Sequence, residues 1–168
     1  NSKLETNIRS IYALGDCNGK GAFTHTSYND YEIMVDQLLG AKKRTLDDRI
    51  TNYALYIDPP LGRAGMTLSQ AKESGKNLLF ARMPMSDISR AKEKGETAGK
   101  MEVIVDADSE PILGAAVLGT GGDEIIGTFL TAMYGKMSYK ILMNSVQTHP
   151  TVTELIPTLL QQLKPVKK

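Results

Sequence analysis

Apolar and polar residues follow a helical period in the early part of the chain. Apolar side chains recur every three or four residues between residues 27 and 40, and Gly40 is a natural stop, so the pattern predicts one helix there. The segment 8–14 before it is apolar and tolerant of β structure, which predicts a strand. A strand that leads into a helix is half of a βα unit and needs parallel strands beside it, and no other part of the chain shows this pattern. We therefore expect residues 1–45 to come from the end of a larger domain.

The rest of the chain, residues 46–168, has the mixed pattern of an α+β domain. Thr67 and Gln70 form a capping-box pattern at the start of a helix that Gly75 ends. The pattern predicts further helical segments over residues 119–135, 139–143 and after residue 149, with a polar helical turn or loop over 88–94. Strands are predicted over residues 53–57, 77–83, 101–105 and 112–118, the last two joined by a hairpin. This layout predicts an antiparallel sheet of about four to five strands with helices on one side.

The composition suits one ordinary domain and excludes several classes of function. The chain has 168 residues, a hydrophobic share of 41% and a net charge of +1. This is enough apolar material for a core and too little positive charge for nucleic-acid binding. No apolar run approaches the ~18 residues that span a membrane, and the first residues show no secretory signal. We therefore expect a cytoplasmic protein with no nucleic-acid or membrane partner. The absence of a starting Met favours a piece of a longer protein.

Cysteine and glycine patterns limit the chemistry further. Cys17 is the only cysteine, so the chain has no internal disulfide and no CxxC or CxxxxC redox pair, and we expect it to be a small buried apolar residue. Residues 119–124 begin like a dinucleotide-binding turn, but Glu124 stands where the third glycine belongs. Residues 15–21 lack the spacing of a phosphate-binding loop. We interpret both glycine segments as structural turns and expect no metal site.

The segment from His149 to Glu154 is the most specific candidate for chemistry. Pro150 suits the first turn of a helix, which places His149 at or just before the N-cap, where it projects off the helix end. The carboxylate of Glu154 can turn back to hold one imidazole nitrogen, which makes an acid–base pair that still needs a nucleophile. The alternative is purely structural, because the leucine stripe that follows needs a partner surface and Pro157 should kink or restart the helix near Thr153.

A second candidate site surrounds Gly15 and Asp16, at the predicted strand end. Ligands of open α/β sheets bind there, and a carboxylate can accept hydrogen bonds from ligand hydroxyls. The start of the predicted helix, near Thr26, presents its N–H groups to the same place. The competing interpretation is that Asp16 merely forms a turn. For His25 the residue pattern leaves helix capping, packing and ligand contact open.

These residues together resemble the pyridine nucleotide–disulfide oxidoreductases over nearly the whole chain and in the family's order. Within the family, the chain is most similar to the glutathione-reductase-like and mercuric-reductase-like proteins of bacteria, including those linked to reactive chlorine and copper stress. The matching segments are Glu5-Thr6-Asn7, Ile11 to Asp16, Asp58-Pro59-Pro60-Leu61, Gly65-Met66-Thr67, Arg90-Ala91, Gly95-Glu96-Thr97, Ile112-Leu113-Gly114, Glu124-Ile125-Ile126 and the HPTxxE signature at 149–154.

The resemblance implies a role for each candidate residue. Asp16 matches the aspartate that binds the ribityl chain of FAD, Thr24 matches the helix start near the flavin ring, and His25 falls where some relatives carry histidine. His149 matches the acid–base residue for the redox cysteines of the partner subunit in a homodimer, and Glu154 matches the carboxylate that orients it. In the family NAD(P)H reduces FAD, FAD reduces a cysteine pair, and the pair reduces a small disulfide or a metal ion.

The resemblance also implies a domain division and leaves alternatives. Residues 1–45 correspond to the end of the FAD-binding domain and residues 46–168 to the dimerisation domain. The GxGxxG motif, the CxxxxC pair and the NAD(P)H domain are missing from this sequence, so we expect the chain alone to be inactive and to lose FAD. The alternatives are a stand-alone dimerisation or binding module without a redox role, and an NADH oxidase or coenzyme A-disulfide reductase. Relatives of the last two types generally lack the His–Glu signature.

Overall fold

The chain forms two compact units in a computed structural model, which describes residues 1–167. The first unit comprises residues 1–49, and the second begins at Ile50. Each unit has an apolar core of its own. None of the helices within residues 1–167 is long and apolar enough to cross a membrane.

The first unit consists of one long helix and the loops that pack on it. Its elements are the 3-10 turn η1 (Gly15–Asn18), the helix α1 (Thr24–Leu39) and the 3-10 turn η2 (Leu46–Asp48). The predicted helix is confirmed, begins three residues earlier than its pattern indicated, and ends before Gly40. Its core is small: Leu4, Ile33 and Met34 are buried, with Leu46 packed against them.

The predicted strand over residues 8–14 is wrong. The segment holds only one isolated bridge, between Glu5 and Tyr12, and Ile8 and Ile11 are both 54% exposed. A strand satisfies its backbone groups by pairing with a neighbour. Within residues 1–167 no neighbouring strand pairs with this segment, so its apolar composition alone does not produce a strand. Of the βα unit predicted for this part of the chain, the helix is therefore present and the strand is not.

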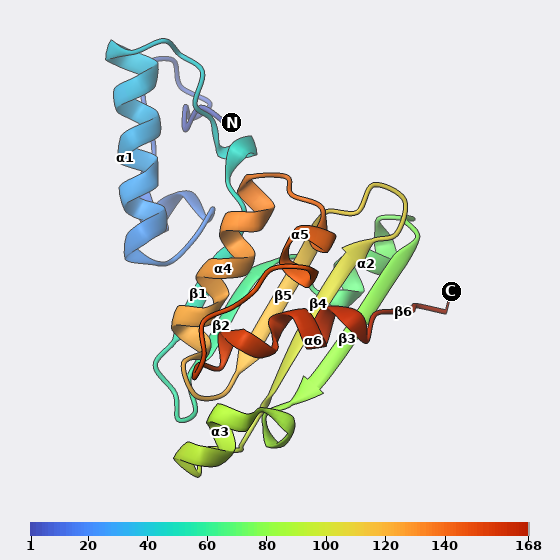
Figure 1. Cartoon of the computed structure of the whole chain (residues 1–168). Coiled ribbons are helices and arrows are strands. Elements are labelled where there is room, and N and C mark those ends of the chain that lie inside the picture. The colour runs from blue at the N-terminus through green and yellow to red at the C-terminus, as the bar shows by residue number, and fades with distance from the viewer. Residues whose placement is uncertain (168) are drawn as a thin grey trace. The chain divides into compact units, whose positions relative to one another are not determined.

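The second unit is built on a six-stranded antiparallel sheet with the order β1-β2-β5-β4-β3-β6 (Figure 1). The predicted α+β class is confirmed, and all four predicted strands are present. The β2 strand was missed because two of its five residues are glycines, and the two-residue β6 has no pattern of its own. The strands are β1 (Asn52–Leu55), β2 (Leu61–Gly65), β3 (Leu78–Pro84), β4 (Lys100–Asp106), β5 (Ile112–Leu118) and β6 (Lys164–Pro165).

Most helices of this unit lie on one face of the sheet. Figure 1 shows α4, α5 and α6 over that face, while α2 lies on the other, so the prediction of helices on one side needs this correction. The reason is the alternation of side chains along the strands, because Leu78 and Ile104 point away from the main core and pack against Ala71 of α2. The helices are α2 (Leu68–Glu73), α3 (Ser89–Lys94), α4 (Gly122–Tyr134), α5 (Tyr139–Met143) and α6 (Ile156–Gln161), with 3-10 turns η3 (Met85–Asp87) and η4 (Thr153–Leu155).

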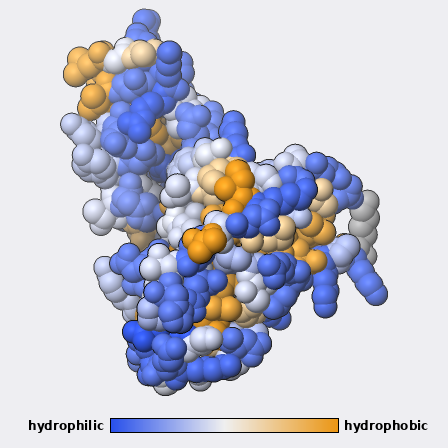
Figure 2. All heavy atoms as spheres, viewed as in Figure 1, coloured by the Kyte–Doolittle hydropathy of each residue, from blue (hydrophilic) through white to orange (hydrophobic). Residues whose placement is uncertain are grey.

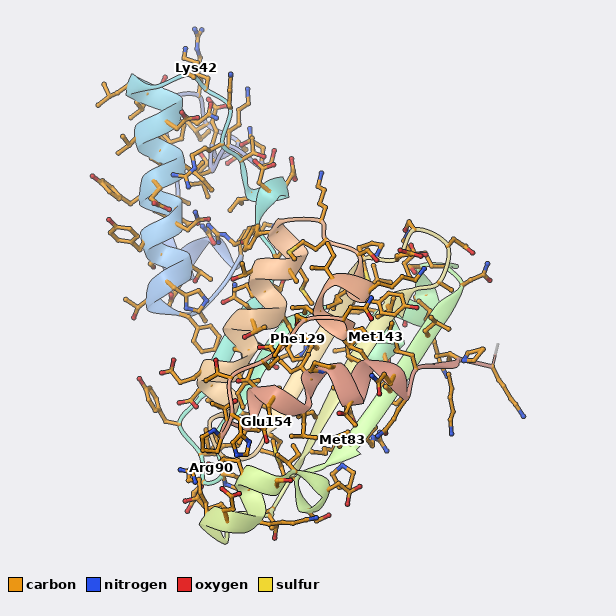
Figure 3. All side chains as sticks on the ribbon, viewed as in Figure 1. Lys42, Met83, Arg90, Phe129, Met143 and Glu154 are labelled. Atoms are coloured by element: carbon orange, nitrogen blue, oxygen red, sulfur yellow. The ribbon has the colours of Figure 1, made fainter. Side chains whose placement is uncertain are left out.

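The main core lies between one face of the sheet and the helices that cover it, chiefly α4 and α6, and at one side β2 and α4 approach each other closely. A side chain on Gly62 of β2 would place its Cβ 2.1 Å from the carbonyl oxygen of Gly122, the first residue of α4. Only glycine permits this approach. The close contact brings the apolar face of α4, including the fully buried Phe129 (Figure 3), onto the sheet.

A buried carboxylate closes the hairpin between β4 and β5. Asp106 is 2% exposed and accepts hydrogen bonds from Lys76 Nζ at 2.6 Å and from the backbone N–H groups of Asp108 and Ser109 at 3.0 and 3.3 Å. The ammonium group of Lys76, more than the hairpin N–H groups, holds the pKa of Asp106 far below its ordinary value of 3.8. The predicted hairpin is therefore present, and the carboxylate of Asp106 at its start stabilises it through these hydrogen bonds.

We expect Asp106→Asn to destabilise the chain by about 1–3 kcal/mol at pH 7, because the hairpin donors lose a charged acceptor. The folded pKa lies below the unfolded value of 3.8, so this stabilisation is complete above about pH 4 and is lost as the pH falls towards the folded pKa. Urea unfolding of both proteins from pH 7 to about pH 2.5 checks this. Asp108→Asn, in the same hairpin, is the control and should change little. If the difference in unfolding free energy between the wild type and Asp106→Asn stays constant down to about pH 2.5, the stabilising role of the ionised Asp106 is wrong.

Candidate functional site

His149 and Glu154 are brought together, as their spacing predicts. His149 Nδ1 lies 2.8 Å from Glu154 Oε2. A carboxylate only accepts hydrogen bonds, so in this pair Nδ1 carries the proton and Nε2 is the ring atom that can take another. The histidine side chain is 74% exposed and the glutamate side chain 16%. The arrangement presents a supported imidazole to whatever lies outside this surface.

The backbone around the pair is held from both sides. Thr151 Oγ1 donates to the carbonyl oxygen of Thr148 at 2.7 Å and accepts from the N–H of Glu154 at 3.2 Å. Val152 and Ile156, which flank Glu154 in the chain, are buried in the main core. The backbone of Glu154 is therefore held in place, and His149 projects from a turn that hydrogen bonds and the core keep fixed.

The predicted helix start at Pro150 is wrong. Residues 149–152 form bends, the 3-10 turn η4 begins at Thr153, and α6 begins at Ile156. Pro157 explains the difference, because inside a helix begun at Pro150 its ring would clash with the carbonyl of Thr153. In the observed structure Pro157 sits in the first turn of α6, where its missing N–H costs nothing. The leucine stripe that follows packs against the sheet, as its spacing indicated.

The candidate ligand-binding residues of the first unit lie on two segments that pack together. Asp16 belongs to η1, which contacts α1, and Thr24 and His25 are the first two residues of α1. Asp16 is exposed, and within residues 1–167 its carboxylate has no hydrogen-bond partner. Thr24 is also exposed, and the ring of His25 stacks on Phe23 with centroids 5.5 Å apart. The expected burial of Cys17 is wrong, since this thiol is exposed beside Asp16.

Sequence reasoning missed a buried charge in the first unit. Asp30 is 1% exposed and pairs with the guanidinium of Arg49. Its carboxylate also accepts hydrogen bonds from the N–H of Gly15 at 2.8 Å and from Asn18 Nδ2 at 2.7 Å. The signal was present, because Asp30 precedes the buried Ile33 and Met34 by one helical turn. The apolar residues that mark the helical period, such as Tyr28 and Tyr31, lie on the other, exposed face of α1 and give no sign of this buried charge.

The candidate residues belong to two units and form no metal-binding group within residues 1–167. Within residues 1–167 no three His, Cys, Asp or Glu side chains gather in a way that could hold a metal ion. The His149–Glu154 pair belongs to the second unit, while Asp16, Thr24 and His25 belong to the first. The acid–base pair has no thiol in its own unit, because Cys17 is the only cysteine of the chain.

Comparisons with known proteins agree on one family. The family model described as the dimerisation domain of pyridine nucleotide-disulphide oxidoreductases matches residues 51–160. The probable pyridine nucleotide-disulfide oxidoreductase RclA of Escherichia coli is 37% identical over 163 residues, which cover 96% of this chain and 37% of that protein. A dihydrolipoyl dehydrogenase of Mycobacterium leprae is 27% identical over 154 residues, which cover 91% of this chain and 33% of that protein.

Solved structures give the same result. The Cu(II) complex of the HOCl-induced flavoprotein disulfide reductase RclA from Escherichia coli matches with a TM-score of 0.88 and 36% identity. The match covers 96% of this chain and 38% of that one. The chain thus spans little more than a third of the length of RclA, the first of these relatives.

Proposed function

Because the chain belongs to the pyridine nucleotide-disulphide oxidoreductases and contains their dimerisation domain, we propose that it is the C-terminal part of an FAD-dependent, NAD(P)H-using disulfide reductase. The proposed acceptor is a small disulfide or a metal ion. In this enzyme His149 and Glu154 are the acid–base pair that serves a cysteine pair outside these residues. The 2.8 Å contact between Nδ1 and Oε2, with the ring left exposed, is the observation that carries the proposal.

Thiol–disulfide exchange explains what the pair does. A thiolate is the attacking species, so a base must first take the proton from the thiol. Nε2 of His149 takes that proton, and the carboxylate of Glu154 stabilises the imidazolium that forms. The thiolate then attacks one sulfur of the substrate disulfide, and the proton on Nε2 passes to the sulfur that leaves. This first attack leaves a mixed disulfide between the protein and the substrate. The second thiol of the pair then loses its proton and attacks the cysteine sulfur of the mixed disulfide, and the second substrate sulfur leaves as a thiol with that proton. Two electrons have then passed from the cysteine pair to the substrate, and the cysteine pair is a disulfide.

The residues of the first unit fit part of a flavin site. FAD, when bound, carries the electrons from NAD(P)H to the cysteine pair. Asp16 offers an exposed carboxylate without a partner in residues 1–167, which suits the hydroxyls of a ribityl chain. Thr24 and His25 lie at the start of the adjacent helix. These three residues are one side of a pocket, so the chain by itself is not expected to retain FAD.

A homodimer completes the proposed site. The second unit has the dimerisation-domain fold of its family. His149 projects from its own unit, and Val146, three residues before it, is fully exposed. A histidine in this position can exchange a proton with groups on another subunit. A second copy of the protein would supply the thiols and would also cover the exposed side chain of Val146.

The complete protein that contains this chain tests the proposal. We expect a yellow product with bound FAD that oxidises NAD(P)H, gains two titratable thiols on reduction, and sediments as a dimer. A panel of small disulfides and of Cu(II) and Hg(II) salts then identifies the acceptor. A colourless, flavin-free protein without NAD(P)H oxidation overturns the proposed activity. A catalytically competent monomer overturns the shared site.

A further inference from the structure

Asp30 is a buried anion to which the proposed chemistry gives no role. Three donors meet its carboxylate: the N–H of Gly15, the side-chain amide of Asn18 and the guanidinium of Arg49. Arg49 is itself only 10% exposed, and its Nε donates to Asn29 Oδ1 at 2.8 Å. No side-chain nitrogen or oxygen buried within residues 1–167 is left without a partner, so this network is fully satisfied.

A buried, charged network of this kind contributes little net free energy to folding. Removing two charges from water costs several kcal/mol, roughly what their attraction returns, and apolar residues of similar volume often do as well. What a satisfied polar network does provide is a single defined geometry. The question is therefore which part of the first unit needs a defined geometry.

The partners of Asp30 point to the turn η1. Gly15 and Asn18 are the first and last residues of this four-residue turn, and both donate to the same carboxylate oxygen, Oδ2. Gly15 has a φ of +75°, and a Cβ there would lie 2.7 Å from Ser27 Oγ, so the turn also packs closely on α1. Asp16 lies between these two fixed points. Its own carboxylate is exposed and has no partner within residues 1–167.

Arg49 extends the network around Asp30, which we call the Asp30 clamp: Asp30 with its donors Gly15, Asn18 and Arg49. Its Nη2 reaches the other oxygen of Asp30, and its Nη1 donates to the carbonyl oxygen of Lys20 at 3.4 Å. The arginine thus contacts the loop after η1 as well as the helix behind it. Its charge also offsets that of Asp30, so the anion behind the turn does not oppose Asp16 as a second uncompensated carboxylate.

We infer that Asp30, held by Arg49, is a positioning residue that fixes the η1 turn so that Asp16 presents a free carboxylate to the flavin ribityl chain. This inference rests on the proposed function, because it assumes that Asp16 meets FAD. Asp30 does not touch the cofactor. Its contribution is to hold the turn in its binding geometry before the ligand arrives, which reduces the ordering cost of binding.

The test measures FAD affinity in the complete protein after removal and re-addition of the flavin. Asp30→Asn should weaken FAD binding by about tenfold or more, as the loss of hydrogen bonds to a charged group does. Asn18→Ala removes one of the three donors to Asp30, together with the side chain's bonds to Ala13 and Lys20, and leaves the buried ion pair, so it should fold and weaken binding several-fold. At saturating FAD both variants should reach wild-type turnover, because neither side chain contacts the reacting atoms.

Two comparisons separate positioning from simple destabilisation. Ile33→Ala removes a side chain of the same helix that is buried with Leu4 and Met34 and makes none of the hydrogen bonds that hold the turn. It should lower the thermal stability without a comparable loss of FAD affinity. Adding Arg49→Gln to Asp30→Asn replaces the charged pair with a neutral one that can still form hydrogen bonds, and should recover part of the affinity. If Ile33→Ala weakens FAD binding as much as Asp30→Asn at equal thermal shift, the role of Asp30 is structural and the inference is wrong.

Asp16→Asn distinguishes this inference from the proposal on which it rests. If Asp16→Asn weakens FAD binding while Asp30→Asn and Asn18→Ala bind as the wild type does, the positioning role is overturned and the flavin site stands. If the wild-type complete protein takes up no FAD, the proposed function itself fails, and the positioning role fails with it.

Discussion

His149→Ala, in the complete protein, is expected to slow reduction of the substrate by about 10²–10⁴-fold, which is the usual contribution of a general acid–base. FAD content and reduction of the flavin by NAD(P)H should stay near wild type, because neither step needs a proton from this imidazole. Rapid-mixing experiments follow the two half-reactions separately. Thr158→Ala, an exposed change on α6, is the matched control and should leave both half-reactions unaltered.

Glu154→Gln sharpens this prediction. Glutamine keeps an oxygen that can accept from Nδ1 but removes the charge that stabilises the imidazolium. Substrate reduction should therefore fall, by less than in His149→Ala, and flavin reduction should remain intact. If His149→Ala slows both half-reactions equally, the histidine holds the structure of the segment and the proposed acid–base role is wrong.

Local signals in the sequence were sufficient for much of the second unit. The capping box of Thr67 and Gln70 is present, with Thr67 Oγ1 accepting from the N–H of Gln70 at 3.2 Å. The alternating residues of β4 and the apolar face of α4 form the main core, as their periods predict. These features depend on contacts within one element or between neighbours in the chain, which a pattern of residue types records directly.

Features that depend on distant contacts were not predictable. In β2, Gly62 permits the close approach of α4 and Gly65 has a φ of +72° beside the carbonyl of Leu113, and neither requirement appears in a local pattern of residue types. The helical period of α1 is marked by residues such as Tyr28 and Tyr31, yet both are exposed, and Thr26 and Asp30 are buried. Figure 2 shows apolar side chains at the surface near the end of α1, where Leu39 is 86% exposed.

The candidate sites show the same difference between contacts that are local in the sequence and contacts that are distant. The contact between His149 and Glu154 spans five residues and could be predicted from spacing and resemblance. The Asp30 clamp joins residues that are 15 and 19 positions apart, and no short motif records it. The helix start at Pro150 was misplaced because Pro157 cannot lie inside a helix that begins there, whereas the restart that Pro157 predicts near Thr153 is observed as η4 followed by α6.

Phe129→Ala is expected to cause the largest loss of stability, about 3–5 kcal/mol, because it empties a fully buried aromatic site between α4 and the sheet. Urea unfolding followed by circular dichroism measures the change. Because the chain has two compact units, the transition of the second unit should move while that of the first does not.

Phe80→Ala is the matched control for this prediction. Phe80 lies on the opposite face of the sheet, in the small cluster beside α2, and is only half-buried. Its loss removes less apolar surface from the interior and leaves an opening that water can fill, so it should cost less than half as much. If the two substitutions destabilise the chain equally, the far face of the sheet is as well covered as the face under α4. The assignment of the main core to the α4 side would then be wrong.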